Sequence, residues 1–317
     1  MKSTEKIHDL LTISKRSVNA WIAADPFRQS AIVAYYAIFS IPALLVIIIA
    51  CAGLFFGEEA VHGEISSQIS ATLSADVAEQ IEDIIAKASE KQSSVIATII
   101  SLITLIVGST AVFAQIQVSL NEIWEVKPNT KQFWMQTLKD RLFSFGLVIS
   151  ICFLLLVSLL LSAALSAFSG WIKNHLPDFM MVVFGVLDVL VSFLMVTALF
   201  AMMFKILPDA KIRWKNIWIG SMVTALLFII GKFALGIYFG KADPGSTYGA
   251  AGSIILLMLW VSYSCMIVFL GAEFTKQYTV FYEGQVEPKK YAEHIEVPPE
   301  KSIIAKKKTA IEKMEHQ

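Results

Sequence analysis

Two charged residues lie inside long apolar stretches of this chain, where a charge is costly. Lys232 interrupts the run Ile217 to Phe239, and Asp188 interrupts the run Phe179 to Leu207. A lysine near the centre of a membrane helix costs about 2.5 to 3.5 kcal/mol, so its amine needs water or an acidic partner. Counting from the external ends of the two runs places both residues roughly 10 to 14 Å below the external face of the membrane. We therefore expect Asp188 and Lys232 to meet inside a helix bundle.

Such a pair supports two interpretations. It is either a structural ion pair that fixes helix register, or a polar centre at which a substrate or proton is handled. The sequence leaves both open. In the second case Lys232 would hold an anionic headgroup.

A second polar line follows one helical face through Thr110, Ala114, Gln117 and Asn121, at spacings of four, three and four. Gln and Asn often form hydrogen bonds between membrane helices, so close packing is favoured over a solute path for this line. Five more residues complete the candidate substrate path or polar core: Tyr35, Ser40, Tyr248, Ser253 and Glu273. A local salt bridge to Lys276 is the simplest role for Glu273.

Six apolar runs must position these residues. Each exceeds the about 20 residues that a helix needs to cross a hydrocarbon layer, and unpaired peptide groups are too costly there for any other structure. The chain is 56% hydrophobic and 16% charged. We predict an all-α polytopic membrane bundle, residues 30–278, with six transmembrane helices at about 30–57, 93–119, 142–168, 179–207, 217–239 and 249–275.

Basic residues fall in every second gap between the runs. Twenty-one of the 26 Lys and Arg residues lie before the first run, in 121–141, in 205–215 or after Thr275. The positive-inside rule then places both termini in the cytoplasm. Trp124 and Trp214 lie near internal gaps, as expected for interfacial anchors. The spacing Gly236-Ile-Tyr-Phe-Gly240 predicts close contact between helix backbones.

The segments outside the spans have their own patterns. Residues 1–29 predict an amphipathic helix that lies on the membrane surface or packs on the bundle, two alternatives of similar weight. The external loop 58–92 has an apolar residue at every fourth position, which predicts short helices over the bundle. Residues 279–317 predict a disordered, Lys-rich cytoplasmic tail.

The sequence lacks the common motifs of catalytic and metal-binding sites. There is no phosphate-binding loop and no HExxH, and the five His and three Cys residues show no ligand spacing. We expect no catalytic residues, no metal site and no cofactor.

Three stretches together resemble a known family. They are Ala34-Tyr-Tyr-Ala-Ile-Phe-Ser-Ile-Pro42, Ser109-Thr-Ala-Val-Phe-Ala-Gln-Ile-Gln117, and Ser246-Thr-Tyr-Gly-Ala-Ala-Gly-Ser253 followed by Gly271-Ala-Glu-Phe274. The chain resembles the bacterial YihY/virulence factor BrkB family. The resemblance implies a multi-pass inner-membrane protein, and some relatives are linked to moving lipids or lipid-linked glycans. The family has also carried an old label, tRNA-processing ribonuclease BN. The sequence shows no acid/base pair or metal cluster that would support this activity.

The leading hypothesis is a transporter or a protein that translocates a lipid or a lipid-linked glycan of the cell envelope. The alternative is a non-transporting envelope scaffold, and a membrane-bound ribonuclease has the least support. The expected partners are membrane lipids, including anionic headgroups, and no nucleic acid. A homo-oligomer is compatible with the sequence.

Overall fold

The computed structural model describes residues 2–40, 108, 111–129, 178–242 and 252–295. This part of the chain is mostly helical, with helices α1 (Lys2–Ala23), α7 (Asp178–Ile206), α8 (Trp214–Ala242) and α9 (Gly252–Glu283). Residues 26–40 and 111–123 are helical too. The external loop 58–92, the third run 142–168 and much of the first two runs lie outside the described residues, so six spans remains a prediction.

Three of the described helices are long and apolar enough to cross a membrane. The candidate spans are Val189–Ile206, Trp214–Phe239 and Ile254–Glu283. The bounds of α7 and α8 agree with the predicted runs to within about three residues, the usual uncertainty of helix ends. The last helix instead continues eight residues beyond the predicted end at Thr275. Gly284 then ends it, with a φ of 85° that glycine adopts without strain.

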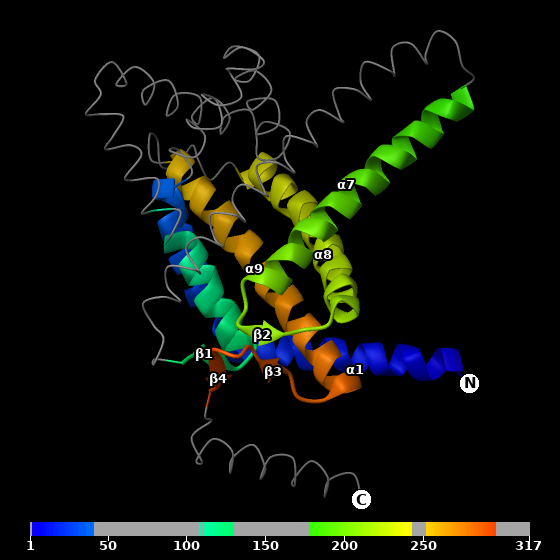
Figure 1. The fold of residues 1–317 in the computed structure, drawn as a ribbon. Helices are drawn as coiled ribbons and strands as arrows, with labels where there is room; N and C mark the ends of the chain where they lie inside the picture. Colours follow the sequence, from blue (N-terminus) through cyan, green and yellow to red (C-terminus); the bar gives the residue numbers. More distant parts are fainter. Residues whose placement is uncertain (1, 41–107, 109–110, 130–177, 243–251, 296–317) are drawn as a thin grey trace, which may run out of the picture.

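Helix α8 packs antiparallel against α7 on one side and α9 on the other, while α9 also packs against α1 (Figure 1). The C-terminus of α7, the N-terminus of α8 and the C-terminus of α9 lie together, and we call this the strand end. Basic residues of three predicted internal segments meet here, in agreement with their alternation along the sequence. Those described are Lys127, Lys205, Lys211, Arg213, Lys215, Lys276, Lys289 and Lys290.

Four short strands give the strand end its name. Strand β1 (Val126–Pro128) pairs antiparallel with β4 (Ala292–His294), and β2 (Ala210–Lys211) pairs antiparallel with β3 (Glu287–Pro288). The segment after α9 therefore joins two loops that are far apart in sequence. The prediction of a disordered tail from residue 279 was wrong for 279–295, because backbone hydrogen bonds to those loops order this segment. Residues 296–317 lie outside the described part.

The N-terminal region contains a break between two helices. Helix α1 ends at Ala23, and the next helix begins at Pro26, four residues before the predicted start of the first span at residue 30. Asp25 between them has a φ of 52°, which breaks the helical path, and Pro26 suits the first turn of a new helix. The break turns the chain from α1, which runs crosswise to α8, into the helix 26–40 (Figure 1).

The closest helix contact joins α8 and α9, and we call it the seam. A Cβ added to Gly220 would lie 1.9 Å from Thr275 Oγ1, and one added to Gly271 would lie 2.0 Å from Thr224 Oγ1. Each threonine hydroxyl donates to the carbonyl four residues earlier on its own helix, at 2.7 Å. The seam is thus reciprocal, with a glycine of each helix facing a threonine of the other.

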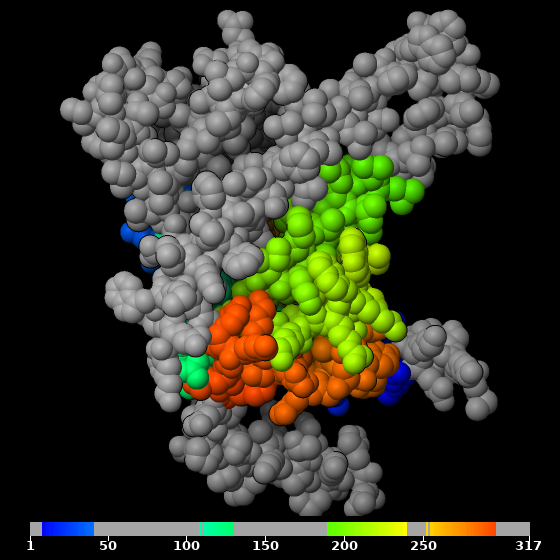
Figure 2. Space-filling model, viewed as in Figure 1, coloured from blue at the N-terminus to red at the C-terminus, as the bar shows by residue number. Residues whose placement is uncertain are grey.

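The predicted glycine contact is not found at Gly236, while the surroundings of Gly240 lie outside the described part. A Cβ added to Gly236, the first glycine of the GxxxG spacing, would meet nothing within 4 Å. Trp124 was also expected at the membrane interface, but it is buried with Phe204, Phe269 and Leu120 in the core near the strand end. Trp214 is exposed as expected, and the Lys205 ammonium lies 5.5 Å from the centre of its ring. In the space-filling view, side chains of α7, α8 and α9 form one continuous surface (Figure 2).

Candidate functional site

A buried carboxylate lies at the centre of the strand end. Asn121 Nδ2 donates to Asp209 Oδ2 at 2.8 Å, and the Asp209 backbone N–H donates to Asn121 Oδ1 at 2.8 Å. Gln117 and Tyr291 also hydrogen-bond to the Asp209 side chain. The Asp209 carbonyl accepts a bond from the Lys289 backbone N–H at 2.8 Å. We call these five residues the Asp209 cluster.

The cluster joins three segments through local features of the sequence. Pro208 ends the helical path of α7, so Asp209 lies in the short link before β2. Gln117 and Asn121 are four residues apart on one face of the helix 111–123. Tyr291 and Lys289 come from the segment after α9. Asp209 therefore fixes the positions of the α7–α8 link, the helix 111–123 and the C-terminal segment relative to one another.

The electrostatics of Asp209 result from opposing effects. Its residue is 2% exposed, and this burial raises the pKa of the carboxyl above its ordinary value. The hydrogen bond from Asn121, the positive charge of Lys289 and the bonds from Gln117 and Tyr291 act in the other direction but do not cancel it. Such a carboxyl group can anchor the loops or take up a proton.

Sequence reasoning identified Gln117 and Asn121 but missed Asp209. Their hydrogen bonds go to a loop carboxylate, which agrees with the packing interpretation of this polar line. A signal for Asp209 was available, since it is the only acidic residue among four basic residues in 205–215. An acidic residue in a basic loop could pair with any of several basic residues, so the sequence alone did not predict its actual neighbours.

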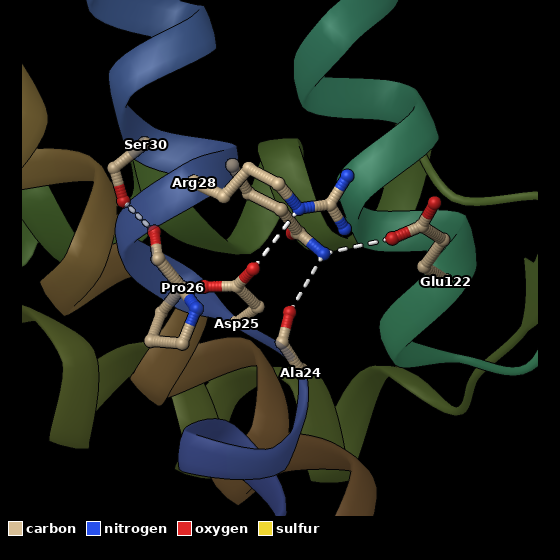
Figure 3. Close-up of polar contacts among 7 residues, drawn as sticks. Ala24, Asp25, Pro26, Arg28, Ser30 and Glu122 are labelled. Carbon is tan, nitrogen blue, oxygen red and sulfur yellow. Dashed lines mark hydrogen bonds and ion pairs between the residues drawn. The ribbon is translucent and has the colours of Figure 1, made fainter.

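A second group of polar contacts fixes the break after α1. Gln29 Nε2 donates to Glu122 Oε2 at 2.7 Å and to the Ala24 carbonyl at 3.1 Å. Arg28 forms an ion pair with Asp25 at 3.0 Å, and Ser30 donates to the Pro26 carbonyl (Figure 3). The break is thereby attached to the helix 111–123, one residue after Asn121.

Glu273 takes part in a local network. Gln277 Nε2 donates to Glu273 Oε1 at 2.8 Å, and Lys276 Nζ lies 4.0 Å from the same oxygen. Lys276 is closer to Glu125, at 3.0 Å. The Glu273 residue is buried at 2% exposure. These contacts match the local role expected for Glu273 and tie α9 to the turn before β1.

Lys232 lies far from these networks. It is 18 residues into α8, about 27 Å along the helix from the strand end at 1.5 Å per residue. It lies on the α7-facing side of α8 with Phe228, whose ring is 5.5 Å from that of Phe200. The structure describes no hydrogen bond or ion pair between Lys232 and the other described side chains.

The Asp188 side chain lies outside the described residues, so its pairing with Lys232 remains a prediction. The backbone adds one constraint. Helix α7 leans away from α8 toward Asp178 (Figure 1). Both residues are 18 residues from the end of their helix at the strand end, Asp188 from Ile206 and Lys232 from Trp214. The expectation of equal depth stays a prediction.

The remaining candidate residues are dispersed. Tyr35 is exposed, and its ring contacts those of Tyr36 and Phe39. Ser40 is buried and donates to the Tyr36 carbonyl at 3.0 Å. Tyr248 and the side chain of Ser253 lie outside the described residues. Among the predicted site residues whose side chains are described, the structure brings together Gln117 and Asn121.

Comparisons with known proteins agree with this architecture. A model of the family described as Virulence factor BrkB matches residues 19–294. A UPF0761 membrane protein of Tolumonas auensis is 32% identical over 180 residues, which cover 56% of this chain and 56% of that protein. One of Verminephrobacter eiseniae is 30% identical over 54% of this chain and 39% of its own length. No solved structure matches.

A longer alignment reaches most of the chain. A UPF0761 membrane protein of Psychrobacter sp. is 24% identical over 274 residues, 86% of this chain and 49% of that protein. The matched part is thus about half the length of these curated relatives. Their printed names describe membrane proteins and state no activity.

Proposed function

Because the chain belongs to the virulence factor BrkB family of integral membrane proteins, we propose that it moves an anionic lipid or lipid-linked glycan across the membrane. The proposed protein is a transporter of the cell envelope without catalytic activity of its own. Lys232 carries this proposal. Its ammonium lies in a candidate membrane span and has no partner among the described side chains.

The position of Lys232 on α8 supports a role inside the bundle. Exposed apolar side chains form a stripe along one side of α8, through Met222, Leu226, Ile230 and Ile237. At 100° per residue Lys232 lies off this stripe, on the side where Ser221, Ala225 and Phe228 are buried or partly buried. An amine in that place needs water or an anion, because leaving it unsolvated in hydrocarbon is too costly. A phosphate-bearing headgroup meets this need.

The proposal includes an orientation. Basic residues gather at the strand end, and such residues are retained on the cytoplasmic side of the inner membrane. We therefore propose that the strand end, with both termini, faces the cytoplasm. Lys232 then lies in the half of the membrane away from the cytoplasm. A headgroup that moves outward from the cytoplasm would pass the level of the Asp209 cluster before it reaches Lys232.

Reconstituted vesicles test the proposal. Purified protein is placed in vesicles that contain fluorescent phosphatidylglycerol or, in parallel, fluorescent phosphatidylcholine, and a membrane-impermeant reductant reports the exposed fraction over time. We expect Lys232→Ala to slow movement of the anionic lipid about tenfold, the factor given by about 1.4 kcal/mol of lost binding free energy. Lys232→Arg should retain most of the rate. Lys215→Ala, at an exposed strand-end lysine, is the matched control.

Equal rates for wild type, Lys232→Ala and empty vesicles would contradict transport of these lipids. Precursor tRNA incubated with the same preparation should stay intact, and its specific cleavage would contradict the non-enzymatic part of the proposal.

The second candidate function is an envelope scaffold that moves nothing. The seam and the Asp209 cluster favour it, since both hold described elements in one fixed arrangement. A scaffold predicts that wild type and Lys232→Ala move lipid no faster than empty vesicles do, and that both assemble equally well. Selective loss of the anionic-lipid rate, with the variant folded normally, would remove this alternative.

A further inference from the structure

Helix α1 has two apolar sides, and the described part of the bundle covers only one. Ile13 and Ser17 are buried, and Trp21 Nε1 donates to the Met266 carbonyl of α9 at 3.1 Å. Leu11 and Ile22 are 65% and 61% exposed. The first set attaches α1 to α9. The second set belongs to a separate stripe that the described part of the bundle leaves open.

The exposed stripe follows helical spacing. At 100° per residue, Leu11, Val18 and Ile22 fall within about 40° of one another. The buried positions Ile13 and Ser17 lie well over a quarter turn away from this direction. Val18 is also exposed. A continuous apolar stripe of this kind is normally covered, and in a membrane protein the adjacent apolar phase is lipid.

The direction of α1 fits the surface of a bilayer. The helix runs crosswise to α8 at the strand end, and it does not run alongside the candidate spans (Figure 1). Helix α1 meets α9 at Met266, and the 32 residues of α9, about 48 Å long, exceed a hydrocarbon layer of about 30 Å, so the C-terminal part of α9 extends beyond that layer. A helix in this place lies near the lipid headgroups, parallel to the membrane plane.

The charge on α1 also indicates that lipid covers the exposed stripe. Lys15 is exposed beside the stripe, about 40° from Leu11, and the structure describes no ion pair between it and a described carboxylate. Cationic side chains next to an apolar stripe suit a leaflet with anionic lipids. Two copies of α1 that met through this stripe would instead bring their own basic residues together. Charge therefore favours lipid over a second copy of the chain.

We propose that α1 is an in-plane membrane helix at the strand end. Its Leu11, Val18 and Ile22 side chains insert among acyl chains, while Lys15 binds the phosphates of anionic phospholipids. The opposite side of α1 is held by α9, so the helix couples the lipid surface to the bundle. This role does not depend on whether the protein transports anything.

Fluorescent labels at single cysteines test the insertion. The full chain, with its three native cysteines replaced by serine, is labelled at Leu11→Cys or Val18→Cys, with Arg16→Cys as the control on another exposed side of α1. In nanodiscs, brominated acyl chains should quench the labels at positions 11 and 18 but not at 16. Quenching of all three by aqueous iodide alone would overturn the proposal. Disulfide formation between two Leu11→Cys chains would also overturn it and indicate a dimer contact.

The headgroup contact has its own test on folded protein. With the label at Leu11→Cys, quenching by brominated lipid should be stronger in nanodiscs of phosphatidylglycerol than in those of phosphatidylcholine. The Lys15→Gln change should remove this difference. If the difference remained, binding of anionic headgroups by Lys15 would be refuted. Gel filtration of each variant confirms that the bundle is intact.

Discussion

The seam between α8 and α9 and the Asp209 cluster both fix the described helices, but by different physical means. The seam contains nothing larger than threonine where the helices cross, and its contacts are van der Waals contacts between backbone and side chain. The cluster holds a buried carboxyl group through four neighbours from two other segments. The contribution of the seam to stability should therefore be sensitive to a single added carbon and independent of pH. The contribution of the cluster should depend on pH.

The largest effect is expected from adding bulk to the seam. Gly220→Val places side-chain atoms where Thr275 Oγ1 now lies, and such overpacking costs about 3 kcal/mol when the backbone must shift. Thermal unfolding in detergent should show a strongly lowered midpoint. Gly236→Ala on the same helix is the control, because its surroundings are open, and it should be neutral or slightly stabilising. A Gly220→Val protein as stable as wild type would show that the helices do not cross here.

Removing the carboxyl group from the cluster should have a smaller effect. Asp209→Ala leaves the Asn121 amide and the Gln117 side chain without their acceptor, which costs about 1 to 3 kcal/mol. Asp209→Asn keeps an oxygen that accepts from Asn121 and should lose less. Denaturation of the two variants side by side measures the difference. Equal losses would mean that the hydrogen bonds of Asp209 contribute little.

The pH dependence separates the two regions. Burial raises the pKa of Asp209 above the 3.8 of an ordinary aspartate, so folding favours its protonated form. Its contribution to stability is full below pH 3.8 and is lost as the pH rises through the folded-state pKa. The difference in unfolding free energy between wild type and Asp209→Asn should thus change over this window, and the effect of Gly220→Ala should not. A seam variant with the same pH slope would contradict the distinction.

The smallest effect concerns the glycine that ends α9. Gly284→Ala introduces a Cβ at a φ of 85° but meets no neighbour within 4 Å, so only backbone strain of about 1 kcal/mol is added. Thermal unfolding should show a midpoint between those of wild type and Asp209→Ala. A loss as large as that of Gly220→Val would mean that the C-terminal segment depends on this turn far more than its short strands suggest.

The sequence predicted the long helices well and their contacts poorly. The apolar runs around Lys232 and Asp188 gave the bounds of α8 and α7, because a membrane helix depends on a local run of apolar residues. The strands after α9 were missed because their partners lie in loops far away in the sequence. A pattern in one segment carries no information about such a partner.

The contacts of glycine and acidic residues were also not predictable from local sequence patterns. Gly236 and Gly240 have the familiar spacing, but the tight contact uses Gly220 and Gly271, each opposite a threonine of the other helix. Only the register of two helices reveals this match. Gln117 and Asn121 were recognised as a polar face from their spacing. Their common partner, Asp209, could be found only from the folded loop.

Lys232 is central to the proposed function, as the residue that receives an anionic headgroup within the membrane. The most direct test is the ratio of phosphatidylglycerol to phosphatidylcholine movement in vesicles that contain wild type or Lys232→Ala. The proposal predicts a ratio well above one for wild type, near one for Lys232→Ala, and close to the wild-type value for Lys232→Arg. The same ratio in all three proteins would contradict it.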